Sequence, residues 1–347
     1  MKITATLVEA TQVAALATSD QLNRTETHIP GWVVRGAFAS SWLRARANRM
    51  PSGRFEMSDA ERALFVETFE GGVRFSPLFV KDPPTSLSVF GHKYEGKDRS
   101  HRLDTALKPN FAAPEDCPSC GATFESKRGL VEAPPARTRT SVSIGDAETA
   151  REGLLFSRRS LEPSRLWSQQ QFASTLTGWL TGSETGLAQL KDLTTIRLGG
   201  RRTTQGLTAL EISAGEPTVD PEILDDGTLI LRLTSPAVLI DGTGRPVNRP
   251  TDAYLSGALG LGVRVVKAWT RWERIGGWHM ASGLPKHTEL TVTAGSTFAV
   301  RALDGGGIPR DSATQLLRDG LGLRRHEGFG HLRPQPPGPT GAEGTGE

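Results

Sequence analysis

The sequence lacks the features of a secreted or membrane protein. Its 347 residues include only two cysteines, three positions apart, which is too few for a disulfide framework and is a spacing suited to metal or redox chemistry. No apolar run approaches the roughly 20 residues that a membrane-spanning helix needs. The N-terminal segment MKITATLVEA alternates apolar and polar residues and lacks the continuous apolar stretch of a signal peptide. We therefore expect a cytoplasmic protein without a membrane partner.

Neither sign of charge dominates the composition. The chain has 41 lysines and arginines against 38 acidic residues, a net charge of +3, so composition alone does not indicate nucleic-acid binding. The hydrophobic content of 37% is sufficient for real cores and excludes a disordered protein. The arginines nevertheless occur in pairs at 158–159, 201–202 and 324–325, each near glycine or serine. Cations on such a permissive backbone indicate that an anionic chain approaches it.

The apolar pattern predicts an α+β fold, with period-2 runs for strands and 3.6-period stripes for helices. The expected strands are 2–9, 73–80, 87–90, 140–144, 171–182, two within 195–212, 228–240, 263–278 and 289–303. The expected helices are 29–47, opened by Pro30, and 59–69, 184–193 and 312–320.

These elements suggest two domains, 1–165 and 166–333, a usual division for a chain of this length. Residues 92–135 are rich in proline, glycine, lysine and aspartate and have little periodicity. Because a compact domain rarely carries so long a plain loop, we interpret them as an insertion in the first domain. The tail, 334–347, is rich in proline, glycine and acidic residues and is expected to be disordered.

Two glycine-rich loops are candidate anion sites. The internal basic loop is LGGRRTTQG (198–206) and the terminal basic loop is GLRRHEGFG (322–330). Backbone N–H groups and guanidinium forks of such loops can wrap phosphates, and an aromatic ring can stack on a base of a single strand. The alternative for each loop is a basic turn exposed to water. The candidate residues are Gly199, Gly200, Arg201, Arg202 and Gly206 in the internal basic loop, and Gly322, Arg324, Arg325, Gly328, Phe329 and Gly330 in the terminal basic loop.

A metal site is predicted inside the insertion. The motif CPSCG supplies Cys117 and Cys120, half of the tetrahedral ligand set that zinc prefers. His101 and His92 precede Cys117 by 16 and 25 residues and are the expected third and fourth ligands. Structural zinc is expected because a segment with little apolar content cannot form a hydrophobic core, and a bound metal can stabilise it instead. Two ordinary thiols are the alternative, whereas a redox pair lacks the βαβ setting it needs. Carboxylates that could replace either histidine are Asp104 and Asp116.

Four short motifs, in this order, resemble one family. They are IPGWVVRGAFA (29–39), RRTTQG (201–206), GGWHMASGLPKHTELTVTAGSTFAV (276–300) and GLRRHEGFGHL (322–332). Together they resemble the RAMP superfamily of CRISPR–Cas proteins, and most of all Csx-ten, the Cas-five-like subunit of type III-D effector complexes. The tag-binding subunit of type III-B complexes shares part of the third motif. The resemblance covers residues 1 to about 333.

The resemblance implies two ferredoxin-like, RRM-related domains and a non-catalytic role. Subunits of this kind hold the 5′ repeat-derived tag of the CRISPR guide RNA and anchor one end of an antiviral effector ribonucleoprotein complex. The implied partners are the guide RNA, the backbone RAMP subunits, the large polymerase-like subunit and, indirectly, target RNA. Besides the two basic loops, the motifs include Arg35, Lys286 and His287 as RNA contacts. Trp32 departs from the small residue usual in the family, which bears on the tightness of the first helix turn.

The rival interpretation is an endoribonuclease of the same superfamily, which cuts guide precursor or target RNA. Its candidate catalytic residues are Asp20, in a polar loop, and His28, beside the first motif. RNA cleavage needs a placed base and a placed acid, and neither residue has an evident partner in the sequence. A third interpretation is a zinc-stabilised RNA-binding module outside CRISPR systems.

Overall fold

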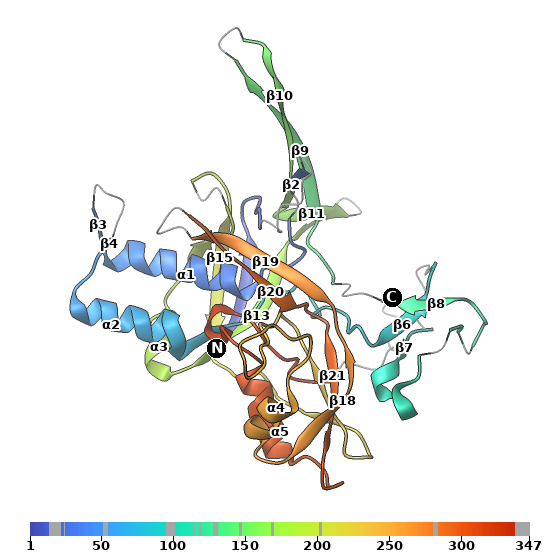
Figure 1. The fold of residues 1–347 in the computed structure, drawn as a ribbon. Helices are drawn as coiled ribbons and strands as arrows, with labels where there is room; N and C mark the ends of the chain where they lie inside the picture. The colour runs from blue at the N-terminus through green and yellow to red at the C-terminus, as the bar shows by residue number, and fades with distance from the viewer. Residues whose placement is uncertain are drawn as a thin grey trace.

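Two hydrophobic cores, each built on its own β-sheet, make up a mixed α/β fold (Figure 1). The computed structural model describes residues 1–13, 22–23, 25–50, 55–94, 101–113, 115–117, 119–127, 131–145, 148–167, 170–200, 203–279 and 284–336. None of the helices in these ranges is long and apolar enough to cross a membrane.

The first sheet is antiparallel and has the spatial order β14-β15-β1-β13-β5. Alternation along β1 buries Ile3, Ala5 and Leu7 on one face and leaves Thr4 and Thr6 half-buried on the other. The sheet therefore has one apolar face for a core and one hydroxyl-rich face. Its strands are β1 (Lys2–Leu7), β5 (Val73–Phe75), β13 (Thr175–Gly182), β14 (Thr195–Arg197) and β15 (Leu207–Ser213).

Three helices contribute side chains to the core on the apolar face of this sheet. α1 begins directly after Pro30, as predicted, and buries Val34 and Trp42. α2 begins with a capping box, in which Ser58 and Glu61 satisfy each other's backbone N–H groups. The helices are α1 (Gly31–Arg46), α2 (Asp59–Glu67), which continues into a π-helical turn (Thr68–Gly72), and α3 (Glu184–Ala188).

The second sheet is covered on both faces. Leu229 and Leu231 of β17 are buried in the core formed with α4 and α5. Ile230 lies in a separate buried cluster, because successive side chains of a strand point to opposite faces. Every residue of β17 is therefore inside the protein. In spatial order the antiparallel strands are β16 (Glu222–Ile223), β17 (Leu229–Arg232), β21 (Thr297–Ala302) and β18 (Val263–Trp269), and the helices are α4 (Asp252–Leu259) and α5 (Arg310–Asp319).

The predicted insertion covers the second face of this sheet. Ala106, which is fully buried, packs against Ile230 and Ala299. The Phe111 ring meets the Trp269 ring edge-on, with centroids 5.7 Å apart. A segment that interrupts the first half of the chain thus completes the packing of the second half. Its elements are β6 (Val89–His92), β7 (Leu103–Asp104), 3-10 turns at Thr105–Leu107 and Pro109–Phe111, and β8 (Phe124–Ser126), with β6 between the other two strands.

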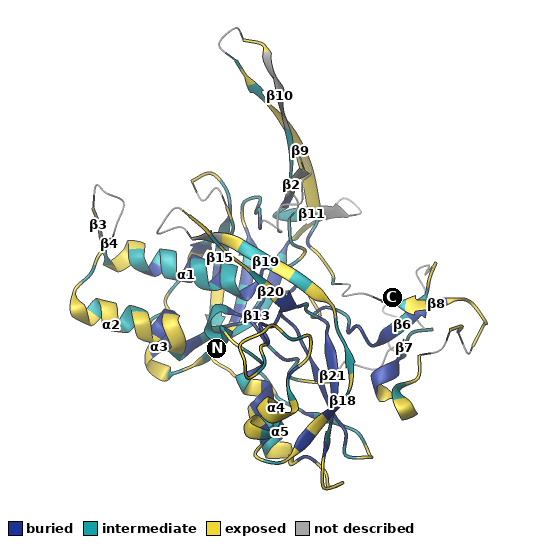
Figure 2. Cartoon of the chain, in the orientation of Figure 1, coloured by how far each residue is buried: buried dark blue, intermediate teal, exposed yellow. Residues whose placement is uncertain are grey.

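Three two-stranded ribbons and a small three-stranded sheet, in which β2 joins the long ribbon of β9 and β10, complete the described fold. The ribbon of β9 and β10 projects far from the rest of the molecule (Figure 1), and β9 is exposed along almost its whole length (Figure 2). β2 (Leu22–Asn23) pairs in parallel with β10. The ribbons are β3 (Asn48–Arg49) with β4 (Phe55–Glu56), β9 (Ala136–Ile144) with β10 (Ala150–Leu161), β11 (Ser164–Trp167) with β12 (Gln170–Ala173), and β19 (Trp272–His279) with β20 (Leu284–Val292).

The structure departs from the predicted elements at three places. β13, β14 and β15 follow the predicted boundary at 165/166, yet they pair into the first sheet, so the two cores divide the chain between Ile212 and Val219. The strand predicted over 228–240 ends at Arg232 and continues only as isolated bridges, because the chain there contacts several different segments. α4 has no counterpart among the predicted helices.

Candidate metal centre and nucleic-acid interface

Two histidines and two cysteines converge in the insertion. Their ligand atoms all lie within 4.8 Å of one another. The Cys120 Sγ lies 3.2 Å from the His92 Nε2. The His101 Nδ1 lies 3.6 Å from the Cys117 Sγ and 3.3 Å from the same His92 nitrogen. A tetrahedral zinc ion with bonds of about 2.0–2.3 Å would set its ligands roughly 3.3–3.8 Å apart. The cluster therefore has the donor set and spacing of a metal-binding site that suits zinc.

A tight turn and two strands form this cluster. His92 ends β6, and His101 lies just before β7. The Gly121 N–H donates to the Cys117 carbonyl (2.8 Å), and the Cys117 N–H donates to the Ala122 carbonyl (2.7 Å). Burial opposes ionisation of the Cys117 thiol, but hydrogen bonds from His92 and from the turn lower its pKa to about 6. The thiolate is the form that binds a metal, so the turn prepares Cys117 as a ligand.

Asp104, a predicted substitute ligand, belongs instead to a buried ion cluster. Its Oδ2 lies 2.7 Å from the Arg232 Nη1, and the Arg232 Nε lies 2.7 Å from Glu222. The Ser88 hydroxyl accepts a further hydrogen bond from Arg232 (3.2 Å). The other Asp104 oxygen accepts from the Ala106 N–H (3.0 Å). The ion cluster thus fastens the insertion to β17 of the second sheet.

The terminal basic loop packs tightly against the start of α1. A Cβ added to Gly328, whose φ is +97°, would lie 2.6 Å from the Gly31 Cα, so only glycine permits this approach. Phe329 is 2% exposed and stacks on Trp32, with ring centroids 4.9 Å apart. Trp32 thus already covers one face of the Phe329 ring, and stacking of Phe329 on a base remains a prediction. The glycines of this loop serve protein packing.

Arg324 is neutralised inside the protein. Its Nε and Nη2 donate to the two carboxylate oxygens of Glu327, each at 2.7 Å, and its Nη1 donates to Glu289 (3.0 Å). Lys286, another predicted RNA contact, lies 3.4 Å from the same Glu327. Burial opposes ionisation of Glu327, but the neighbouring cations lower its pKa to about 2. Carboxylates of the chain thus already pair with Arg324 and Lys286, two of the cations that were predicted to bind RNA.

The other predicted RNA contacts differ in how many hydrogen bonds and ion pairs they already form within the protein. Arg35 donates to the Phe69 carbonyl (2.6 Å) and pairs with Glu70 (2.7 Å). Arg325, in the 3-10 turn Arg325–Glu327, donates one hydrogen bond to the last carbonyl of α5 (3.2 Å). His287 on β20 is exposed. Arg325 and His287 therefore keep more capacity for an external partner than Arg35 or Arg324.

The internal basic loop lies against the segment that follows β1. The Gly200 N–H donates to the Gln12 carbonyl (2.9 Å). A Cβ on Gly199, whose φ is +73°, would lie 2.1 Å from the same oxygen, so this glycine also serves close packing. Arg201 and Arg202, the predicted phosphate contacts, lie outside the described residues.

The candidate nuclease residues do not form a catalytic pair in the described structure. Both ring nitrogens of His28 are buried and, among the described residues, have no hydrogen-bond partner. The ring stacks on Phe79 with centroids 5.2 Å apart, and burial lowers its pKa to about 4. A buried ring without a placed partner lacks the acid–base pair that RNA cleavage needs, and a catalytic role for His28 remains an untested prediction. Asp20 lies outside the described residues.

A basic surface that the sequence prediction missed lies on β9 and β10, here called the arginine ribbon. The register sets Arg139 opposite Arg158 and Arg137 opposite Ser160. Because opposite and alternate residues share a face, the three arginines lie on one side. The Arg158 guanidinium lies 4.3 Å from the Phe156 ring centroid. Within the described ranges, no carboxylate pairs with Arg137 or Arg139. The alternation in ARTRT was the signal available in the sequence.

Comparison with known proteins assigns the chain to a class and then to a family. The family model described as CRISPR-associated protein (Cas_Cmr3) matches residues 136–333, more than half of the chain. The match makes the chain a type III CRISPR–Cas protein of the RAMP-like kind. It belongs to the Cas_Cmr3 family, and the matched span runs from the arginine ribbon through the terminal basic loop. No curated protein matches the sequence.

Solved structures show only distant likeness. A chain of the type III-B Cmr-beta bound to cognate target RNA and AMPPnP is 12% identical, with a TM-score of 0.49 over 96% of this chain and 99% of that chain. A chain of Cmr-beta bound to cognate target RNA is 13% identical, with a TM-score of 0.48 over 96% of each chain. The product of a Cas6-related gene from Pyrococcus furiosus is 8% identical, with a TM-score of 0.34 over 96% of this chain and 97% of that chain.

Proposed function

We propose that the chain is a guide-RNA-binding and assembly subunit of a type III CRISPR effector complex and holds the 5′ tag of the guide. The observation that carries the proposal is the arginine ribbon. Arg137 and Arg139 are exposed on one face of β9, and within the described ranges no carboxylate pairs with either of them. A single RNA strand laid along this face would place phosphates against these two guanidinium groups, and Phe156 beneath Arg158 adds an apolar surface.

Two further residues are proposed RNA contacts outside the ribbon, the half-buried Arg325 and the exposed His287. Arg325 and His287 are the predicted contacts with the most remaining capacity, and we propose that they contact the RNA directly. Arg324 and Lys286 act through their carboxylate partners, by holding the terminal basic loop against β20. Arg35 acts through Glu70, by holding α1 to the turn Thr68–Gly72. The partners we propose are the guide RNA, the backbone RAMP subunits and the large polymerase-like subunit.

Removal of the ribbon charges tests the proposal. The variant Arg137→Ala/Arg139→Ala should bind tag RNA more weakly in an anisotropy titration. Each lost phosphate contact lowers the salt slope by about 0.7 for a single strand, so the slope should fall by about 1.4. Arg44→Ala/Arg62→Ala removes the same charge from exposed positions on α1 and α2 and should bind like the wild type. Equal affinities and slopes for the two variants would refute an RNA role for the ribbon.

We also propose that the cluster of His92, His101, Cys117 and Cys120 holds one structural zinc ion. Metal analysis should find about one zinc per chain. Cys117→Ser/Cys120→Ser should lose it, whereas Asp116→Asn, in the same loop and outside the cluster, should keep it. Full zinc occupancy in the double cysteine variant would contradict the assignment.

For the subtype, we propose a type III-D complex, on the resemblance of the four motifs to Csx-ten. Purification of the tagged chain from its host, with mass spectrometry of the associated subunits, distinguishes type III-D from type III-B. A separate assay of the chain purified alone tests the nuclease alternative. Cleavage of repeat RNA by the isolated chain would replace the scaffold role with a catalytic one.

A further inference from the structure

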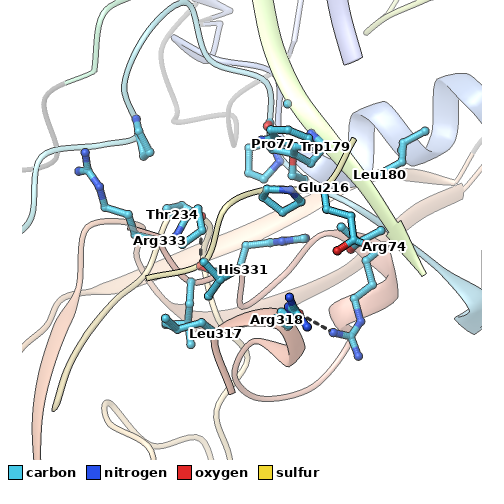
Figure 3. Close-up of a pocket in the computed structure, with 18 of the residues that line it drawn as sticks. Arg74, Pro77, Trp179, Leu180, Glu216, Thr234, Leu317, Arg318, His331 and Arg333 are labelled. Carbon is cyan, nitrogen blue, oxygen red and sulfur yellow. Dashed lines mark hydrogen bonds between the residues drawn. The ribbon is translucent and has the colours of Figure 1, made fainter. Parts of the chain in front are cut away.

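A cavity of about 760 Å³ lies between the two cores (Figure 3). β5 and β13 of the first sheet line one side, and the end of α5 and the segment 331–336 line the other. Its volume falls within the range of roughly 300–1,000 Å³ typical of small-molecule sites. Neither the metal cluster nor the arginine ribbon contributes to it.

The first sheet supplies a flat aromatic surface to this cavity. Alternation along β13 buries Leu180 in the core and turns Trp179 to the opposite, hydroxyl-rich face, between Thr177 and Thr181. All three of these outward residues line the cavity. Trp179 is half-buried, and among the described residues no aromatic ring stacks on it. The arrangement leaves an indole ring that can receive a planar apolar group.

Three guanidinium groups surround the same space, with Arg74 and Arg318 on one side and Arg333 on the other (Figure 3). Arg74 donates to the Arg318 carbonyl (2.7 Å) and pairs with Asp319 (3.1 Å). Arg333 has its nearest carboxylate, Asp82, at 3.8 Å, and Arg318 is exposed. Arginine forks recognise phosphate oxygens in pairs, so the lining favours a phosphorylated ligand.

His331, at the centre of Figure 3, carries an unsatisfied acceptor. Its ring is hydrogen-bonded to the Phe75 backbone, and burial, with the charge of Arg74, lowers its pKa to about 4. The neutral ring therefore donates through Nδ1 and presents the Nε2 lone pair, which is buried and has no partner among the described residues. Such an acceptor calls for a hydroxyl or amine from a ligand.

We propose that this cavity binds a ribonucleotide. A nucleotide is the class of ligand that combines a planar ring for Trp179, a phosphate for the arginines and hydroxyl donors for the His331 Nε2. The site deepens the proposed RNA-binding function, because the nucleotide can be one residue of an RNA strand. A free nucleotide has the same chemistry, and the two sources are separated by experiment.

Calorimetric titration of the purified chain tests the site, with AMP and UMP as probes and with adenosine and ribose 5-phosphate as fragments. Trp179→Ala and Arg318→Ala should each weaken binding. The loss of a stacking platform corresponds to a decrease of between about 5- and 150-fold. Matched controls are Trp272→Ala, a 46% exposed tryptophan on β19, and Arg310→Ala, on α5 outside the cavity. Both controls should bind like the wild type.

A second titration uses tag RNA with the same four variants. Binding of free nucleotides that depends on Trp179 and Arg318 supports a free-nucleotide site. Weaker RNA binding by these two variants, without binding of free nucleotides, supports a nucleotide subsite for the strand. Wild-type behaviour of both variants toward nucleotides and RNA would overturn the inference. If the arginine ribbon variant still lost RNA in that case, the proposed function would stand without this site.

Discussion

Replacement of Arg232 measures how strongly charge fastens the insertion to the second sheet. The Arg232 side chain is 3% exposed and lies 2.7 Å from both Asp104 and Glu222. Arg232→Met replaces the apolar stem of the arginine side chain but removes the guanidinium group, which leaves two buried carboxylates without a cation. The removal of one partner from a buried ion pair costs about 3–5 kcal/mol, because the remaining charge is uncompensated. Since two carboxylates lose their cation here, we expect a cost near 5 kcal/mol.

Urea unfolding and hydrogen exchange with mass spectrometry should both report this loss. Exchange should accelerate in β17 and β7, which meet at the ion cluster, and should remain unchanged in α1 of the first core. Arg310→Ala is the control, because it breaks an exposed pair with Asp220 and should cost at most about 1 kcal/mol. A loss for Arg232→Met no larger than that of the control would refute the reasoning. The addition of Asp104→Asn and Glu222→Gln should restore part of the stability.

Two further predictions concern single residues. Burial lowers the pKa of His28 from 6.5 to about 4. Between these two pH values His28 is therefore protonated in the unfolded chain and neutral in the folded chain. The free energy of unfolding should therefore decrease as the pH falls from 6.5 toward 4. His28→Phe should flatten the dependence of Tm on pH between these values. An unchanged slope in the variant would contradict this prediction. Gly328→Val should lower the free energy of unfolding by at least about 1–3 kcal/mol, because the new side chain clashes with Gly31. In thermal unfolding, Gly305→Ala, also at positive φ but in open space, should cost less, and equal losses would exclude the contact as the cause.

Local patterns were sufficient for much of the secondary structure and for the metal cluster. α1 begins at the predicted proline because proline suits the first helical turn and its apolar spacing follows the helical period. Cys117 and Cys120 are brought together by their own turn, so their proximity needs no distant contact. His92 and His101 lie in the same insertion, within reach of that turn. Candidate ligands at such a cluster therefore follow from residue type and short spacing.

The roles of the terminal basic loop, in contrast, depend on distant segments. The sequence shows Arg324 and Phe329 on a glycine-rich backbone, which equally suits RNA or protein packing. The fold brings Glu289 to the arginine and Trp32 to the ring, because β20 and α1 both pack against the loop.

The amino-acid sequence by itself thus determined the helices and strands with strong periodicity, the four metal-ligand candidates and the presence of paired arginines. Tertiary structure decided which arginines are neutralised, which glycines exist for close packing, and which sheet face the insertion covers. The physical reason is that burial and charge compensation depend on residues brought together from distant parts of the chain, and local spacing carries no record of those partners.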